Sequence, residues 1–320
     1  MARGGELDSI SHLTIGSTLA GLLTAIPVIS NHHEFMLPIM ISCIIGSLAP
    51  DLDVISRLKP ELYLRYHRGA SHSFFLFPFW SLLVAGLLSA CWLNIPFLLL
   101  WFSVSAGYLL HIVLDLLNSY GTQIAYPFRT DRKGYHVLPL FDLVLWSAHA
   151  VFAVIWLQQG LGTGFPFTLL YAGSVAYIGI RFYYRTKIKK QLESKHSSSQ
   201  VLIFPTFSLF NWSIVLVGHD AVQAGVWRYG NIIWQSPINL GEAGDRYVKC
   251  SEQTDAVKLL KNFSPYLAVQ KITHPDGIKI RWLDLRYLER ANYCLMACVL
   301  IDQSYTIQRS YIGWFKPEGE

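Results

Sequence analysis

Long apolar runs occupy the first part of the chain and end near residue 184. Six of them approach the roughly 20 mostly apolar residues with which a helix crosses the hydrocarbon core of a bilayer. These runs cover residues 13–30, 35–49, 74–93, 97–117, 143–157 and 165–183. The second and fifth runs are short, so five or four spans is the alternative. The pattern predicts a polytopic α-helical membrane domain of about six spans over residues 1–184.

Residues 201–320 mix charged and apolar positions, as soluble domains do. Strand-like runs cover residues 212–217, 268–273, 278–285 and 304–313, with one helix expected near residues 252–262. The turn signal Pro275-Asp276-Gly277 separates two of these runs. We therefore predict a mainly β (α+β) soluble C-terminal domain, to which the sequence assigns no role.

The segment between these two parts, residues 185–200, is basic and ends in a serine run. Basic residues beside a span anchor the topology and attract anionic lipid headgroups. We predict a basic juxtamembrane linker here, and a specific lipid site is the alternative.

Lysine and arginine fall on one side of the six-span arrangement. The loops at residues 31–34, 94–96 and 158–164 contain neither residue type. The other side receives Arg3, Arg57, Lys59, Arg65, Arg68, Arg129, Arg132, Lys133, Arg181, Arg185, Lys187, Lys189 and Lys190. Because loops rich in lysine and arginine stay in the cytoplasm, we expect both termini there.

Composition agrees with this division. Apolar residues make up 52% of the 320 residues and charged residues only 15%. The five cysteines are an odd number at unrelated spacings, so no disulfide framework or zinc ribbon is indicated. The net charge of +5 is explained by the membrane topology, and no nucleic-acid-binding motif is present. We expect no nucleic-acid partner.

Two histidine and aspartate pairs lie inside or beside the predicted spans. Asp8 and His12 are four residues apart, and so are His111 and Asp115. This spacing puts each pair on one face of a helix. An ionised side chain at the centre of a span costs roughly 2.5–3.5 kcal/mol, so it calls for a reason. Histidines and carboxylates on facing helices are a known way to build metal sites in bundles.

Loops supply further candidates. Asp51 and Asp53 follow a proline at the end of the second run, where alternate residues of a non-helical turn can converge on one ion. His67 and His72 flank a glycine that permits the backbone reversal needed to aim both imidazoles at one point. Asp142 stands at the entrance of the fifth run.

All nine candidates fall at or near the predicted cytoplasmic face, although they were not used to derive the topology. They are Asp8, His12, Asp51, Asp53, His67, His72, His111, Asp115 and Asp142. Imidazole with carboxylate suits a divalent metal such as Zn, with Mn or Fe as alternatives. Nine candidates exceed the three or four ligands of one catalytic zinc, so two or more ions are expected.

Some of these residues have ordinary structural interpretations. Asp8 could be a helix-start residue, Asp142 the N-cap of the fifth span, and His12 a polar tie between helices. The remaining histidines of the set, together with Asp115, are harder to explain in this way.

At these residues the sequence resembles the YdjM/YbcI-type family of membrane-bound metal-dependent hydrolases. The shared features are Asp8 with His12, Pro50-Asp51-Leu52-Asp53, His67-Arg68-Gly69-Ala70-Ser71-His72-Ser73, His111 with Asp115, and Asn118-Ser119-Tyr120-Gly121-Thr122 through Pro127-Phe128. Family members often have threonine at the position of Ser71, which keeps the hydroxyl. The resemblance covers about residues 8–146.

The resemblance implies more than the spacing shows. The family is distantly similar to zinc-dependent phospholipase C and to S/P-type nucleases, which hydrolyse phosphoesters at polynuclear zinc sites on a helical scaffold. It implies these metal ligands: His12, Asp51, Asp53, His67, His72, His111 and Asp115.

These observations predict a membrane-bound metal-dependent hydrolase of phosphoester bonds at the inner leaflet of a bacterial cytoplasmic membrane. Its expected partners are membrane lipids and an amphiphilic, phospholipid-like substrate. Arg68 would orient the phosphate as an always-charged planar fork, and Asp53 is the candidate general base. Two alternatives remain. One is a transporter or metal-handling protein that uses the same polar cluster, and the other is a non-catalytic module whose metal ties loops to helices.

Overall fold

A computed structural model describes residues 2–58, 62, 64, 67–159, 164–242, 244–288 and 294–315 of the protein. The chain divides into two compact units. One comprises Met1–Ser56 with Tyr66–Phe182, and the other comprises Arg57–Arg65 with Tyr183–Glu320.

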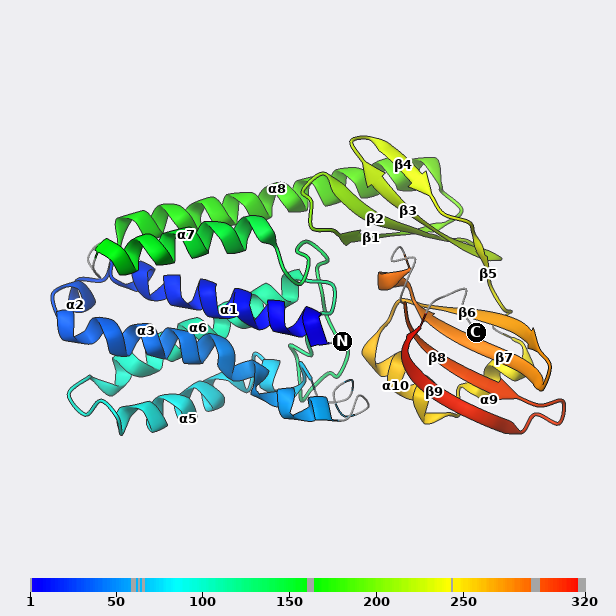
Figure 1. The fold of residues 1–320 in the computed structure, drawn as a ribbon, viewed down its shortest axis with the longest axis horizontal. Coiled ribbons are helices and arrows are strands. Elements are labelled where there is room, and N and C mark those ends of the chain that lie inside the picture. The colour runs from blue at the N-terminus through cyan, green and yellow to red at the C-terminus, as the bar shows by residue number, and fades with distance from the viewer. Residues whose placement is uncertain are drawn as a thin grey trace. The chain divides into compact units, whose positions relative to one another are not determined.

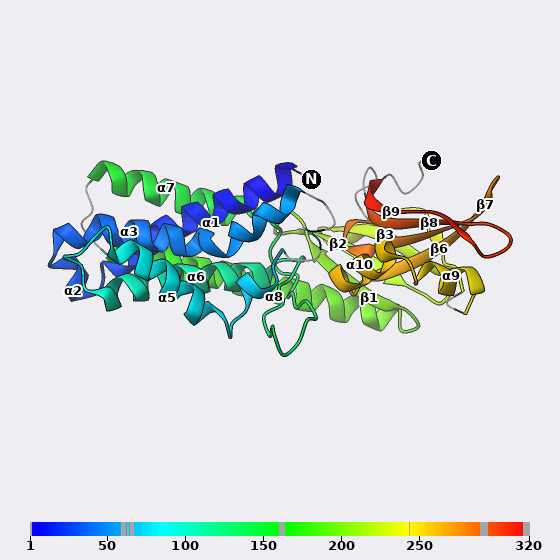
Figure 2. The ribbon, with the colours of Figure 1, turned by 90° about the horizontal axis from the view of Figure 1, so that it is seen from below.

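The first unit is helical (Figure 1). Its α-helices are α1 (Ala2–Leu23), α2 (Pro27–Ser30), α3 (His33–Leu48), α5 (Phe77–Ser89), α6 (Phe97–Leu117), α7 (Leu143–Gln159) and the first part of α8 (Phe165–Lys195). Two 3-10 helices, η1 (Ala49–Leu58) and η2 (Ala70–His72), follow α3 and precede α5. Helix α5 packs against α6 (Figure 2).

Fewer helices than expected are long and apolar enough to cross a bilayer. Within the described residues there are three, His33–Asp53, Phe97–Leu117 and Phe165–Lys195. The apolar helices Phe77–Ser89 and Leu143–Gln158 are shorter. Helix α1 does not qualify because its first half carries polar residues such as Asp8, Ser11 and His12. About three candidate spans therefore replace the expected six.

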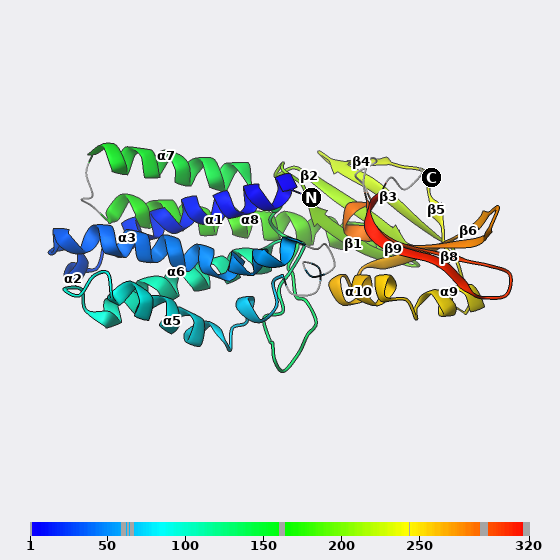
Figure 3. The same ribbon diagram turned by 60° about the horizontal axis from the view of Figure 1, so that its bottom comes forward.

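Small residues let α1, α3 and α6 approach closely, and these helices lie side by side (Figure 3). A Cβ atom at Gly107 of α6 would lie 2.3 Å from the carbonyl oxygen of Cys43, and one at Gly46 of α3 would lie 2.2 Å from that of Val104. Where lipid replaces water, such backbone contact is a main source of helix association. The contact also brings the last turns of α6 next to the end of α3.

The larger segment of the second unit begins at Tyr183, within α8. Its first sheet holds β1 (Gln200–Pro205), β2 (Asn211–Val217), β3 (Ala221–Arg228) and β4 (Asn231–Trp234) in that order, with β5 (Ile238–Asn239) paired to β3, all antiparallel. Ile188 and Leu192 of α8 are buried with Trp212 and Ile214 of this sheet. The expected linker is therefore helical as far as Lys195. Ile188 and Leu192 share one helix face, and burying that face stabilises the helix.

The second sheet is an antiparallel meander in the order of the chain. It comprises β6 (Leu267–His274), β7 (Gly277–Asp284), β8 (Cys294–Ile301) and β9 (Ile307–Phe315), with α9 (Arg246–Ser251), α10 (Asp255–Phe263) and the 3-10 turn η3 (Leu285–Tyr287). The predicted turn is confirmed, because His274 pairs with Gly277. Gly277 has φ +142°, a backbone conformation that side chains disfavour. Two helices replace the one expected, since α9 is too short to show a clear period.

The close contact of α3 with α6 predicts a sharp difference between two glycine substitutions. Gly107→Val should lower stability by at least about 1–3 kcal/mol, because the added atoms meet backbone that cannot move aside. Gly86→Val on α5 is the matched control, since a Cβ there meets nothing within 4 Å. Thermal unfolding in detergent measures both. Equal melting temperatures for the two variants would contradict the packing.

Candidate metal centre

Eight of the nine expected ligands meet in one cluster inside the helical unit. Helix α1, the turn η1, the segment from residue 67 to η2, and helix α6 each contribute two. They are Asp8, His12, Asp51, Asp53, His67, His72, His111 and Asp115. All are buried except Asp53, which is half-buried. Segments far apart in the sequence thus supply one centre.

The two i, i+4 pairs lie as helical spacing predicts. His12 Nε2 is 3.5 Å from Asp8 Oδ1 on α1, and His111 Nε2 is 3.4 Å from Asp115 Oδ2 on α6. Helix packing joins the pairs. His12 Nε2 lies 3.4 Å from Asp115 Oδ1, and the rings of His12 and His111 stack with their centroids 3.8 Å apart.

The end of α3 fixes the proton position of His111. The Nδ1 atom of His111 lies 2.7 Å from the carbonyl oxygen of Ser47. This carbonyl belongs to the last turn of α3, where carbonyls have no partner within the helix. A carbonyl oxygen only accepts, so Nδ1 carries the proton and donates it. In the neutral ring the lone pair is then on Nε2, which faces the cluster.

Ser71 fixes the proton position of His72 in a similar way. The Ser71 hydroxyl donates to Asp53 Oδ2 at 2.7 Å and lies 3.0 Å from His72 Nδ1. Because the hydroxyl proton is already used, the hydroxyl oxygen accepts from Nδ1–H, which leaves the lone pair of His72 on Nε2. Burial lowers the pKa of His72 to about 4, so its ring is neutral near pH 7.

Two lone pairs therefore face each other, because the Nε2 atoms of His72 and His111 are 3.0 Å apart. Asp115 Oδ2 lies 3.1 and 3.4 Å from these nitrogens, and Asp51 Oδ1 lies 3.8 Å from each. A tetrahedral zinc with ligands at 2.0–2.1 Å has edges of about 3.3 Å. Neither carboxylate oxygen accepts a hydrogen bond from the described residues. Four buried acceptors that converge in this way fit a cation.

Neighbouring side chains extend the centre beyond one ion. Three groups bring ligand atoms within 4.8 Å of one another, namely His12 with His111 and Asp115, Asp51 with His72 and His111, and Asp51 with Asp53 and His67. His111 and Asp51 each belong to two groups. Shared ligands of this kind fit two or more adjacent ions, and imidazole with carboxylate suits Zn, Mn or Fe.

Asp53 orients its neighbours. Its Oδ1 lies 2.7 Å from His67 Nδ1, and its Oδ2 accepts from the Ser71 hydroxyl and from the backbone N–H of Arg68 at 3.0 Å. Carboxylates that hold a histidine ring in this way set its orientation as a ligand. The geometry thus favours a positioning role for Asp53 over the general base expected from the sequence.

Arg68 points inward and is almost fully buried. Its guanidinium donates to Asp8, to Asn118 Oδ1 at 3.0 Å, and lies 3.0 Å from Asp115 Oδ1. The backbone of Arg68 has φ 59°, which is uncommon for a residue other than glycine. In this arrangement Arg68 offsets the charge of two buried carboxylates. To orient a phosphate, as the sequence predicts, Arg68 would have to give up these contacts.

Three residues to which the sequence assigned no role support the centre, namely Asn118, Tyr108 and Ser71. Asn118 Nδ2 donates to Asp115 Oδ1 at 3.2 Å. The Tyr108 hydroxyl donates to the carbonyl of Ser71 at 2.6 Å, and Ser71 orients His72 as described. Asn118 follows Asp115 by three residues, and Tyr108 precedes His111 by three. This spacing of one helical turn is the signal that could have identified Asn118 and Tyr108.

Asp142, the ninth expected ligand, has a different environment. Its Oδ1 accepts from the backbone N–H groups of Val144 and Leu145 at 3.1 Å each and so caps α7. Its Oδ2 accepts from the buried Arg181 at 3.1 Å, and the Tyr177 hydroxyl donates to the same carboxylate. Asp142 belongs to none of the ligand groups found among the described residues. These contacts match the alternative interpretation of Asp142 as the N-cap of the helix that follows it.

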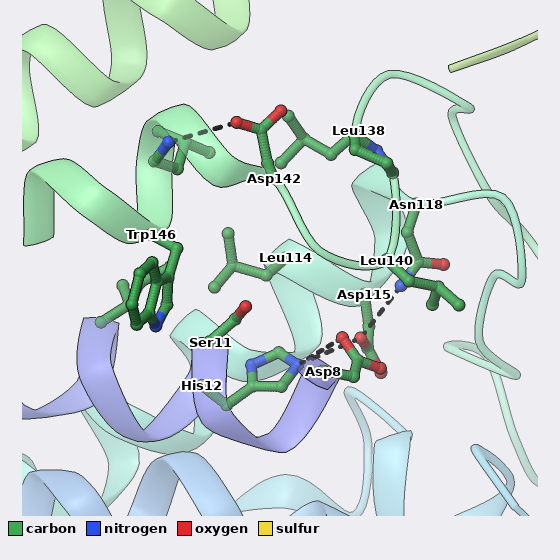
Figure 4. Close-up of a pocket in the computed structure, with 13 residues that line it drawn as sticks. Asp8, Ser11, His12, Leu114, Asp115, Asn118, Leu138, Leu140, Asp142 and Trp146 are labelled. Atoms are coloured by element: carbon green, nitrogen blue, oxygen red, sulfur yellow. Dashed lines mark hydrogen bonds and ion pairs between the residues drawn. The ribbon is translucent and has the colours of Figure 1, made fainter. Parts of the chain in front are cut away.

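A pocket lies beside the cluster, as Figure 4 shows. Its walls come from α1, the C-terminal end of α6, residues 138–140, Asp142 and the first turns of α7. His12, Asp8 and Asp115 form one side of it, and Trp146 lies at another. The pocket therefore borders the α1 side of the centre.

The fold and the centre define a protein with apolar helices that could cross a membrane and a buried cluster of histidines and carboxylates. Residues 7–188 match the YdjM inner membrane protein family, and the chain belongs to this family. The resemblance noted in the sequence is thereby confirmed.

The match to known proteins extends to the C-terminal part. Residues 246–319 match the YfhP C-terminal alpha/beta plait domain, which refines the mainly β expectation. The chain is 30% identical over 316 residues to the "Uncharacterized protein YfhP" of Bacillus subtilis (strain 168), across 98% of this chain and 96% of that protein. No solved structure matches the chain.

The shared ligands predict which substitutions remove the most metal. His111→Ala and Asp51→Ala should each abolish most of the bound metal, because each removes a ligand from two groups, whereas His67→Ala removes one from a single group. Elemental analysis of the purified, folded protein measures the content.

His149→Ala is the matched control for these variants. His149 is also a buried histidine of the helical unit, but its ring nitrogens lie 2.6 Å from the Thr18 hydroxyl and 3.1 Å from the Ser174 hydroxyl, away from the cluster. It should keep the wild-type metal content. Equal losses in His149→Ala and His111→Ala would argue against the assigned centre.

Asp142→Ala should destabilise the protein without removing metal. The change leaves the buried Arg181 without its carboxylate partner, a loss that typically costs about 3–5 kcal/mol. Asp131→Ala, which removes an exposed carboxylate paired with Arg129 and Lys133, is the control and should change stability by less than ~1 kcal/mol. Melting temperature and metal content are measured together. Loss of metal in Asp142→Ala would instead return this residue to the ligand set.

Proposed function

We propose that the protein is a membrane-bound metal-dependent hydrolase of phosphoester bonds in phospholipid-like amphiphiles, acting at the cytoplasmic leaflet. One observation carries the proposal. The unprotonated Nε2 atoms of His72 and His111 face each other with carboxylate oxygens of Asp51 and Asp115 beside them. This arrangement suits a divalent cation far better than an empty protein interior.

A bound metal pair would supply a hydroxide near neutral pH and would stabilise the attacking and leaving oxygens of a phosphoester. The chain's own residues hold the geometry for this chemistry. Ser47 and Ser71 set the tautomers of the two central histidines, and Asp53 orients His67. Arg68 holds Asp8 and Asp115 in place.

The position of the centre supports an amphiphilic substrate. His111 and Asp115 occupy the last turns of the apolar helix α6, and the pocket beside them is lined by both polar and apolar side chains. A ligand with a charged head and a hydrocarbon chain matches such walls. The apolar helices and the inner membrane family support a pocket that lies close to lipid.

A screen of phosphoester substrates tests the proposal. Full-length protein in nanodiscs is loaded with Zn or Mn and assayed for phosphate or alcohol release from phospholipids and alkyl phosphodiesters. His72→Ala should lower the rate at least about 100-fold, equivalent to ~2.7 kcal/mol of barrier, because it removes a central ligand. His149→Ala should leave the rate within a few-fold of wild type.

The same preparations separate the alternatives. Stoichiometric metal without turnover on any phosphorylated amphiphile would reject the hydrolase and favour a non-catalytic, metal-stabilised module. Metal uptake into sealed vesicles that depends on His72 would instead favour the metal-handling alternative.

A further inference from the structure

Helix α8 carries a polarity boundary on its exposed face. From Phe165 to Tyr183 the exposed positions of this helix bear no charge, whereas Lys187 and Lys190 are exposed beyond that point. The ammonium of Lys187 lies 5.8 Å from the ring centroid of Tyr183, which is 61% exposed. Tyrosine beside lysine at the end of an apolar helix is typical of the boundary between lipid and water. The turn from Tyr183 to Lys187 therefore marks the expected exit of α8 from a bilayer.

The first sheet of the second unit packs against α8 from this boundary onward (Figure 1). Two of its turns, residues 206–210 between β1 and β2 and residues 228–231 between β3 and β4, are here called the hairpin tips. Both tips are at the same end of the sheet, because the ends of β1 and β3 pair with the start of β2. The ring centroid of Phe210 in the first tip lies 6.0 Å from that of Tyr184 in α8. The hairpin tips are thus level with the boundary on α8.

The hairpin tips expose aromatic side chains and contain no acid. Phe207, Phe210 and Tyr229 are 61%, 43% and 77% exposed. The ring of Tyr229 stacks on that of Phe210 with the centroids 5.7 Å apart, and Tyr184 joins this pair to α8. The one charged residue of the tips is Arg228, which is exposed. A basic aromatic surface of this kind suits the interface of a bilayer that contains anionic lipid.

The opposite end of the same sheet has a different composition. There the turn between β2 and β3 carries His219 and Asp220, whose side chains are 96% and 89% exposed. The backbone N–H of Leu240 donates to the carbonyl of Asp220, and this contact brings the exposed Glu242 to the same end. Anionic lipid repels such acids. The sheet therefore has one end suited to a membrane interface and one end suited to water.

We infer that the hairpin tips insert into the interface of the leaflet at which α8 leaves the bilayer. Phe207, Phe210 and Tyr229 lie among the lipids there, and Arg228 lies beside their headgroups. The occupant of this surface is the bilayer, because the tips adjoin the exit of an apolar helix and lack the acids found at the other end of the sheet. This anchor holds the first sheet at the membrane, and it does not depend on the metal centre or on the proposed hydrolase.

Photocrosslinking from the two ends of the sheet tests the inference. The variants Tyr229→p-benzoylphenylalanine and His219→p-benzoylphenylalanine of the full-length protein are irradiated in nanodiscs that contain anionic lipid, and mass spectrometry identifies the adducts. The yield of lipid adducts from position 229 should exceed that from position 219 at least about fivefold, because only the first probe lies in the interface. Equal yields, or crosslinks from position 229 to a second copy of the chain without lipid adducts, would overturn the inference.

A charge placed in the tips tests the anchor with the same probe. With the probe at position 229, Phe207→Asp should lower the yield of lipid adducts several-fold, because a carboxylate resists transfer from water into lipid. Ile307→Asp, at an exposed position of β9, is the matched control and should keep the full yield. Melting temperature verifies that each variant is folded. An unchanged yield in Phe207→Asp, or an equal loss in both variants, would contradict the anchor.

Discussion

The buried histidines and carboxylates at the ends of α3 and α6 set the central constraint on this structure. The Nε2 lone pairs of His72 and His111 face each other at 3.0 Å, and the carboxylate of Asp115 lies beside both. Unpaired charge and lone pairs of this kind are costly in an apolar interior, and a cation between them offsets the cost. Because the ligands come from separate segments, binding of a cation would stabilise the fold that assembles them.

The surrounding scaffold serves this arrangement. Glycines at the α3 and α6 contact remove the side-chain bulk that would keep the helices apart, so the Ser47 carbonyl can reach His111. The 3-10 helix η2, which carries His72, is held by the hydroxyl of Tyr108, because this hydroxyl donates to the carbonyl of Ser71. Arg68 takes a backbone conformation uncommon for its type and places its guanidinium between acids of two helices. Such a strained residue, kept in place by many contacts, is typical of functional sites.

Two kinds of buried acid occur in the same helical unit, and their partners distinguish them. Asp142 is matched by an arginine and by the backbone of α7, so its charge is fully compensated by the chain. Asp51 has an oxygen that no described donor approaches, while two imidazole nitrogens lie 3.8 Å from it. Compensation by the chain indicates a structural role, and its absence indicates a ligand.

The sequence by itself determined the division into an apolar helical part and a C-terminal part with strands, and most of the histidine and aspartate candidates. Apolar run length and i, i+4 spacing are local properties, so the faces of α1 and α6 could be predicted. The turn between β6 and β7 was likewise local, because Gly277 supplies the required backbone conformation.

Only the tertiary structure decided which candidates share an ion and which do not. The partner of Asp142 is an arginine on α8, and the acids that hold Arg68 lie on α1 and α6, at separations along the chain that carry no periodic signal. The extension of α8 to Lys195 had the same cause, since Ile188 and Leu192 are buried by strands that follow later in the chain. Local spacing fixes which side chains share a face of an element, whereas packing between distant elements fixes what that face meets.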